Sequence, residues 1–165
     1  MTPDLEHLLR GAPFWRGYAA SPAPSGAPYY TLLLVKLAPG AASPPAFTRS
    51  AFGNSAQGRD LLRCALPLGG GRSMVVATSH LESFCDASMD GSAQRRTQLP
   101  AALRQLDAAC AGGDALYAGD LNWDDKVDGD MDTFLAPPWR DGWRALRPGE
   151  PGFTYDARAN AMLMV

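Results

Sequence analysis

The chain reads Ala115-Leu116-Tyr117-Ala118-Gly119-Asp120-Leu121-Asn122 at the point that decides its expected fold, where a short apolar run ends in Gly-Asp-x-Asn. Side chains alternate faces along a β-strand, so Asp120 and Asn122 are expected to project the same way at its C-terminal end. A carboxylate and an amide there suit a hydrated hard cation and a substrate oxygen. Gly119 would leave the approach to them open. The alternative is an ordinary turn, which Gly-Asp also begins.

The segments before this strand predict a mixed α/β fold. Residues 60–66 and 73–80 read as strands around a triple-glycine turn, which predicts an antiparallel pair. Residues 92–110 carry an apolar stripe of helical period, with Pro100 expected to kink or split the helix. Strands, a helix and the strand at 115–119 together predict an α/β fold, a β-sandwich of mixed sheets flanked by helices.

The two ends of the chain give weaker patterns. Thr2-Pro3-Asp4 predicts a helix start, with its leucines on one face. Aromatic and aliphatic residues predict strands over 29–37 and 153–155, and a short helix is expected near 131–135. The length of 165 residues suits one domain over 1–165.

Composition limits the partners. The formal net charge is −2, so bulk charge gives no support for nucleic-acid binding and such a contact must be local. Cys64, Cys85 and Cys110 match no zinc or disulfide spacing and are expected to be buried thiols. No run of about 20 apolar residues predicts a membrane span, and no signal peptide is predicted.

A second polar group ends the strand at 73–80, in Ser79-His80-Leu81-Glu82-Ser83. His80 can donate to a phosphate oxygen or help expel a leaving group, or it can simply be satisfied by a backbone carbonyl. If the two strands are neighbours, His80 and Asp120 share one edge of the sheet, where ligands of α/β proteins often bind. Arg95, at the start of the next helix, is either a phosphate clamp or a solvated helix residue.

Four strings now follow one another in order: Ser79–Ser83, Gln94-Arg95-Arg96-Thr97-Gln98-Leu99, Gly119–Asn122 and Phe153-Thr154-Tyr155-Asp156. Together they resemble the endonuclease/exonuclease/phosphatase superfamily, and within it the 5′-tyrosyl-DNA phosphodiesterases. The resemblance is closest over residues 52–162. It implies a Mg²⁺-dependent phosphodiester hydrolase of DNA repair, with Mn²⁺ as the alternative ion and DNA with a 5′-phosphotyrosyl end as partner. The implied location is the nucleus, with the cytoplasm as the alternative.

The resemblance also implies roles for single residues. Asp120 would orient or deprotonate the attacking water and bind the metal, Asn122 would bind the phosphate or fix that water, and His80 would bind a non-bridging phosphate oxygen. Tyr155 would lie beside the substrate. Further substrate contacts are implied at Ser83, Arg95 and Arg59, where a structural role is an open alternative.

Two groups of the family pattern do not occur in this sequence. These are a metal-binding Glu ahead of the Thr-Pro start and a Ser-Asp-His strand after the Thr-Tyr-Asp string. The chain is therefore expected to correspond to the middle of a catalytic domain, and to be nearly inactive alone. The alternatives are a catalytically inactive truncated product, and another phosphoesterase of this fold acting on RNA or on a lipid or inositol phosphate.

Overall fold

A computed structural model of the chain describes residues 1–38, 43–85, 90–156, 158–160 and 162. Its main sheet has four strands in the order β3-β4-β5-β6, and a separate pair is formed by β1 and β2. The strands are β1 Tyr18–Ala20, β2 Leu34–Lys36, β3 Phe47–Ala51, β4 Asp60–Gly69, β5 Arg72–Ser79 and β6 Asp114–Tyr117. The helices are α1 Pro3–Gly11, α2 Ser92–Cys110, α3 Asp125–Asp128, α4 Gly142–Leu146 and the 3₁₀ turns η1 Pro13–Gly17 and η2 Met131–Thr133.

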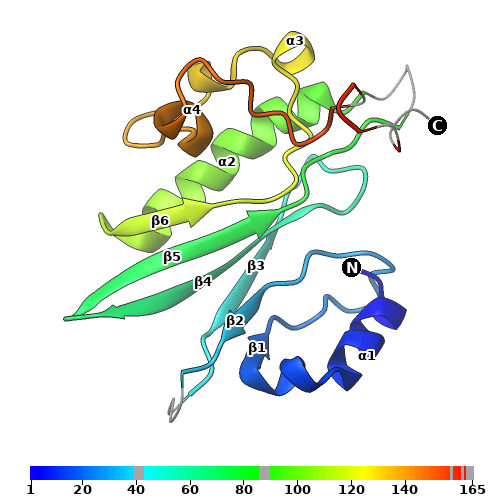
Figure 1. Cartoon of the computed structure of the whole chain (residues 1–165), viewed down its shortest axis with the longest axis vertical. Coiled ribbons are helices and arrows are strands. Elements are labelled where there is room, and N and C mark those ends of the chain that lie inside the picture. Colours follow the sequence, from blue (N-terminus) through cyan, green and yellow to red (C-terminus); the bar gives the residue numbers. More distant parts are fainter. Residues whose placement is uncertain (39–42, 86–89, 157, 161, 163–165) are drawn as a thin grey trace.

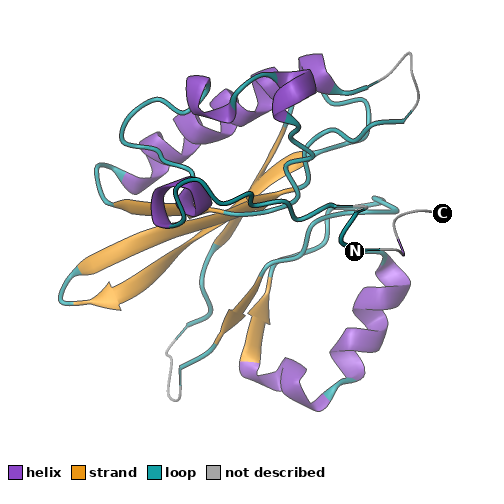
Figure 2. Ribbon diagram, turned by 45° about the horizontal axis from the view of Figure 1, so that its top comes forward, coloured by secondary structure: helices purple, strands orange, loops and turns teal. Residues whose placement is uncertain are grey.

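The expected α/β fold with a mixed sheet is confirmed. β4 pairs antiparallel with both β3 and β5, and β5 pairs in parallel with β6. Parallel neighbours need a crossover connection, and α2 supplies it by covering one face of the sheet (Figure 1). α1, β1 and β2 lie on the other side of the sheet (Figure 2). The crossover places the C-terminal ends of β5 and β6 at the same edge.

The core lies between α2 and the sheet. Leu61, Val75 and Ala77 face the buried side of α2, and this cluster is continuous and apolar. The helix contributes Leu99, Ala102, Leu103 and Leu106. Burial of these side chains, each worth about 1.5–3 kcal/mol for a large aliphatic group, fixes α2 on the sheet.

Several expectations need correction. α2 runs unbroken through Pro100, so the expected split does not occur. Only Leu34–Lys36 of the expected strand over 29–37 is a strand, and the Tyr30 N–H instead donates to the Met1 carbonyl oxygen. Residues 153–155 form no strand. Of the three cysteines only Cys64 is buried.

α1 begins at the expected place, since the Thr2 hydroxyl accepts from the Leu5 N–H. Its buried residue, however, is Glu6, whose carboxylate binds Arg10 and the Tyr30 hydroxyl. Leu8 on the leucine face is 71% exposed. Within the described residues, no helix is long and apolar enough to cross a bilayer.

Candidate active site

The ends of β5 and β6 meet as the sequence predicts. His80 and Asp120 form a parallel bridge just beyond the last strand residues. The Leu81 N–H donates to the Asp120 carbonyl oxygen at 2.9 Å, and the imidazole Nε2 lies 3.8 Å from the Asp120 carboxylate. The expectation that these two residues share one edge of the sheet is confirmed.

Gly119 allows this close approach. A Cβ at position 119 would overlap the backbone carbonyl oxygen of Ser79, the last residue of the neighbouring strand β5. The glycine therefore makes room for β5, and the expectation that it leaves space for a ligand needs correction.

The polar side chains around the two strand ends converge on the Ser83 hydroxyl. Arg59 donates to it from 2.8 Å and the Asn122 amide from 3.1 Å, and the His80 Nε2 lies 3.0 Å away. A hydroxyl oxygen has two lone pairs, and Arg59 and Asn122 occupy both. The Ser83 hydrogen must then point at His80 Nε2. The ring hydrogen of neutral His80 is left on Nδ1, which donates to the Tyr29 hydroxyl at 3.0 Å.

The charge state of His80 follows from its surroundings. Burial lowers the pKa of the imidazole most, and the nearby Arg59 guanidinium lowers it further, whereas the Asp120 carboxylate acts in the opposite direction. The result is a pKa below the ordinary 6.5 and a neutral ring at neutral pH. A neutral ring agrees with the acceptor role of Nε2 deduced from the hydrogen bonds.

Asp120 and Asn122 lie beyond β6, which ends at Tyr117, and the backbone is irregular after the Asp120 bridge. The Asp120 carboxylate accepts from the Asn122 N–H at 3.1 Å, and Asn122 takes a left-handed conformation with φ 47°. The strand periodicity behind the sequence argument therefore does not apply. Asp120 presents a side chain that is 65% exposed. The Asn122 amide nitrogen donates to Leu81 O and Ser83 Oγ, so its carbonyl oxygen is the group that remains for water or a ligand.

Arg95 is not at this surface, and its expected role as a phosphate clamp needs correction. Its guanidinium is buried and bonds both carboxylate oxygens of Asp128, at 2.9 and 3.0 Å. It also donates to the carbonyl oxygens of Glu82 and Asp90. The guanidinium thereby joins the start of α2 to the end of α3 and to the connection that follows β5.

Tyr155 lies in irregular backbone and is 73% exposed. Among the described residues, no hydrogen bond joins it to the His80–Asp120 cluster. Tyr29 is the aromatic side chain that does reach the cluster, with the Arg59 guanidinium 5.6 Å from its ring centre. Sequence reasoning assigned Tyr29 only to a strand, because 51 residues separate it from His80 and no local pattern links the two.

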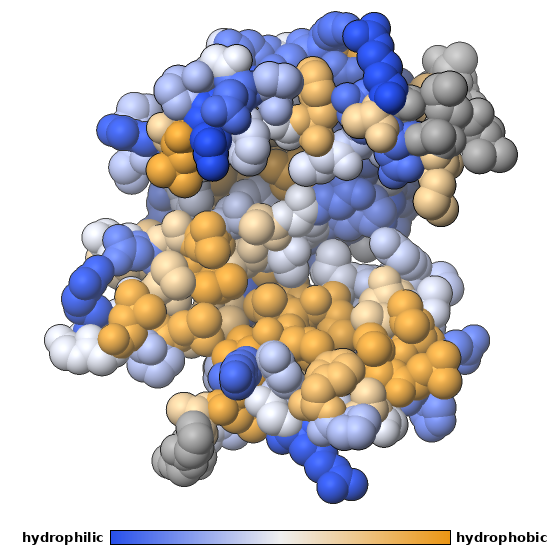
Figure 3. Space-filling view, in the orientation of Figure 1, coloured by the Kyte–Doolittle hydropathy of each residue, from blue (hydrophilic) through white to orange (hydrophobic). Residues whose placement is uncertain are grey.

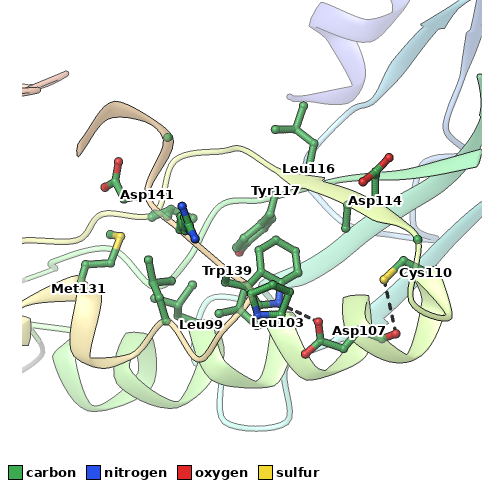
Figure 4. Close-up of a pocket in the computed structure, with 17 residues that line it drawn as sticks. Leu99, Leu103, Asp107, Cys110, Asp114, Leu116, Tyr117, Met131, Trp139 and Asp141 are labelled. Atoms are coloured by element: carbon green, nitrogen blue, oxygen red, sulfur yellow. Dashed lines mark hydrogen bonds between the residues drawn. The ribbon is translucent and has the colours of Figure 1, made fainter. Parts of the chain in front are cut away.

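A hollow of about 530 Å³ lies elsewhere, between α2, β6 and residues 131–142. Leu103, Tyr117 and Trp139 form its apolar walls, and the Trp139 indole donates to Asp107 (Figure 4). Burial raises the pKa of Tyr117 to about 12, so its hydroxyl stays protonated. His80, Asp120 and Ser83 do not line this hollow, and the candidate site is the polar cluster at the strand ends.

The metal-binding capacity of the cluster is limited to one carboxylate. Within the described ranges, no three His, Cys, Asp or Glu side chains are grouped to hold an ion. Mg²⁺ commonly uses one or two carboxylates together with substrate phosphates and waters, so Asp120 fits a shared site of that kind.

Comparisons with known proteins support the fold. No protein-family model matches the chain, and no curated protein matches it. Solved structures do match. TDP2 of D. rerio, complexed with single-strand DNA product, superposes with a TM-score of 0.73 and 23% identity over 98% of this chain and 60% of that one.

A truncated TDP2 of Caenorhabditis elegans gives a TM-score of 0.70 at 23% identity, over 96% of this chain and 60% of that one. Another C. elegans TDP2 structure gives 0.67 at 23% identity, over 96% and 46%. This chain has the TDP2 fold. It spans at most about 60% of the length of these TDP2 chains.

Proposed function

We propose that the chain carries part of the active site of a phosphodiester hydrolase of the 5′-tyrosyl-DNA phosphodiesterase type, with a role in DNA repair. The observation that carries the proposal is the convergence of His80, Asn122 and Arg59 on Ser83 at two adjacent strand ends, with the Asp120 carboxylate beside His80. The TDP2 fold supports it.

A phosphate group fits the donors of this cluster. Arg59 supplies a permanent positive charge, and the Ser83 hydroxyl can turn its hydrogen from His80 Nε2 toward a non-bridging oxygen. His80 gains a second ring N–H for such an oxygen only when it is protonated. Binding an anion here would also favour the protonated form of His80, whose pKa is low in the free chain. His80 can then stabilise charge that develops on the phosphate in the transition state.

Asp120 and Asn122 are suited to hold the attacking water. The exposed carboxylate accepts a hydrogen bond from water and can take its proton, and the Asn122 carbonyl oxygen supplies a second acceptor. The carboxylate is also the group that would hold Mg²⁺, or Mn²⁺, together with the substrate phosphate. When bound, the ion would neutralise charge on the phosphate oxygens.

DNA is the proposed partner, as in the D. rerio TDP2 complex with single-strand DNA product. The net charge of −2 gives no general attraction to nucleic acid, so the contact must be made at the cluster and at exposed aromatic rings. Tyr29 and Tyr155 are 48% and 73% exposed, and such rings can stack on bases. A nuclear location remains a prediction, to be tested by imaging a tagged protein.

The proposal is tested first by binding. A 5′-phosphorylated single-stranded oligonucleotide is expected to bind about tenfold or more tightly than its 5′-hydroxyl counterpart, because one charged hydrogen bond contributes about 1.5–3 kcal/mol. Arg59→Gln should remove this preference, whereas Arg63→Gln, on β4, should keep it. Equal binding of both oligonucleotides by the wild type would overturn the proposal.

Catalysis is tested on a 5′-phosphotyrosyl oligonucleotide with Mg²⁺. The single carboxylate that the described cluster offers to an ion supports only slow turnover. Asp120→Ala should abolish it without weakening phosphate binding measured in the absence of Mg²⁺. Binding without any turnover would favour a catalytically inactive product. Cleavage of RNA or of a lipid or inositol phosphate, with the tyrosyl substrate untouched, would favour another phosphoesterase of this fold.

A further inference from the structure

We infer that Glu82 is a positioning residue, whose buried carboxylate holds residues 52–59 so that Arg59 reaches Ser83. The inference deepens the proposed function and rests on it for the meaning of the Arg59–Ser83 contact. Glu82 lies between the strand-end histidine and Ser83, and its side chain is fully buried. Nothing in the chemistry proposed above uses it.

Four donors meet this carboxylate. The N–H groups of Ala56 and Gln57 donate to Oε1 at 2.8 and 2.9 Å, and the Ser55 hydroxyl and Gln98 amide donate to Oε2 at 2.7 and 3.0 Å. Burial alone would raise the pKa of Glu82, but these hydrogen bonds together lower it below the ordinary 4.5. The four donors thus stabilise the ionised form of Glu82.

Ser55 links the Glu82 carboxylate to the backbone of Arg59. Its hydroxyl gives its only hydrogen to Glu82 and accepts from the backbone N–H of Gln57 at 3.2 Å and of Arg59 at 2.8 Å. The backbone of Arg59 is therefore tied to the carboxylate through a single side chain.

Gln57 fixes the other end of the arginine. Its side-chain oxygen Oε1 accepts from the Ser83 N–H at 2.9 Å and from the Arg59 guanidinium at 2.7 and 3.1 Å. Its amide nitrogen donates to the Ser83 carbonyl oxygen. The terminal nitrogen that bonds Gln57 also donates to the Ser83 hydroxyl, so Gln57 orients the guanidinium toward Ser83.

A glutamine cannot replace the carboxylate in this pocket. The amide N–H₂ of Glu82→Gln would face the Gln98 amide nitrogen, and Gln98 cannot rotate freely because its oxygen accepts from the residue 82 N–H. If the amide turned the other way, it would face the Ala56 and Gln57 N–H groups. In either orientation the new amide N–H₂ faces another hydrogen-bond donor in a buried site, which is destabilising.

The test follows the Arg59 side chain directly. In the wild type the Arg59 Nε–H signal in a ¹⁵N NMR spectrum, identified by its loss in Arg59→Lys, is expected to exchange slowly with water. Glu82→Gln should speed that exchange by about tenfold or more, and should weaken binding of a 5′-phosphorylated oligonucleotide about tenfold. Ser55→Ala removes the hydroxyl that links Glu82 to the backbone N–H groups of Gln57 and Arg59, and leaves the other three donors to Glu82 in place. It should have the same two effects at a smaller cost in stability.

Leu106→Ala is the matched control, because it destabilises the core between α2 and the sheet without touching a polar group. It should lower the melting temperature and leave both the Arg59 signal and oligonucleotide binding unchanged in the folded protein. Unchanged Arg59 exchange in folded Glu82→Gln and Ser55→Ala would overturn the inference. A wild type that fails to bind the oligonucleotide would defeat the proposed function, and the exchange data would still decide the role of Glu82.

Discussion

At the scale of single residues, Gly119 shows how little space separates the two strand ends. Gly119→Ala would drive a methyl group into the Ser79 carbonyl oxygen, and backbone on both sides would have to move. We expect a loss of about 1–3 kcal/mol in the free energy of unfolding, measured by urea denaturation. Gly142→Ala, where no heavy atom lies within 4 Å of the added methyl, should be near neutral. Equal effects of both changes would contradict this account.

His80 offers a titration at the same scale. Burial and the Arg59 charge hold the pKa of the imidazole below 6.5, so the wild-type ring should titrate below that value in an NMR pH series. Arg59→Gln removes a cation that disfavours the imidazolium and should raise the pKa of His80. Arg63→Gln, whose charge is not among the causes of the shift, is the control. A fall in the pKa of His80 on losing Arg59 would show that the ring is not where the structure has it.

At the scale of elements, the first turn of α2 is fixed by the Arg95–Asp128 pair, which is buried on both sides. Asp128→Asn leaves a buried guanidinium without its counter-charge, which costs about 3–5 kcal/mol. The exposed pair Arg72–Asp114 is the matched comparison, and Asp114→Asn should cost less than about 1 kcal/mol. Chemical denaturation of the two variants separates these outcomes.

The same pair makes the protein sensitive to acid. Burial alone would raise the pKa of Asp128, but its bonds to Arg95 and to the Asp124 N–H lower it below the ordinary 3.8. A carboxyl group whose pKa is lower in the folded state stabilises the fold at pH values above its unfolded-state pKa. This contribution is lost as the pH falls through the folded-state pKa. The stability of Asp128→Asn should therefore depend less on pH below about 4 than that of the wild type. Parallel pH curves would contradict the assignment.

At the scale of the whole molecule, hydrophobic side chains remain at the surface. Figure 3 shows a hydrophobic band across the middle of one face. Leu116 on β6 is 52% exposed, and Leu8 of α1 is 71% exposed. Such a surface favours self-association. The average molar mass measured by light scattering should therefore rise with protein concentration. Leu116→Lys should reduce the rise more than Ala108→Lys, which adds the same charge to the outer surface of α2.

The sequence by itself determined the elements whose cause is local. The period of residues 92–110, the triple-glycine hairpin and the Thr2 cap each depend on neighbours a few positions apart. It also located His80 and Asp120, because polar residues that end apolar strands stand out along the chain.

Only the tertiary structure decided which side chains act together. Arg95 turned inward because Asp128, 33 residues away, neutralises it in the core. Tyr29, Arg59 and Glu82 joined the cluster through contacts 24 to 51 residues apart, which no periodicity records. Gly119 serves strand packing for the same reason, since its close neighbour is Ser79 on another strand. Helices, hairpins and caps depend on residues that are close in the sequence. A site depends instead on which distant donors and acceptors remain to pair with one another once the core has formed.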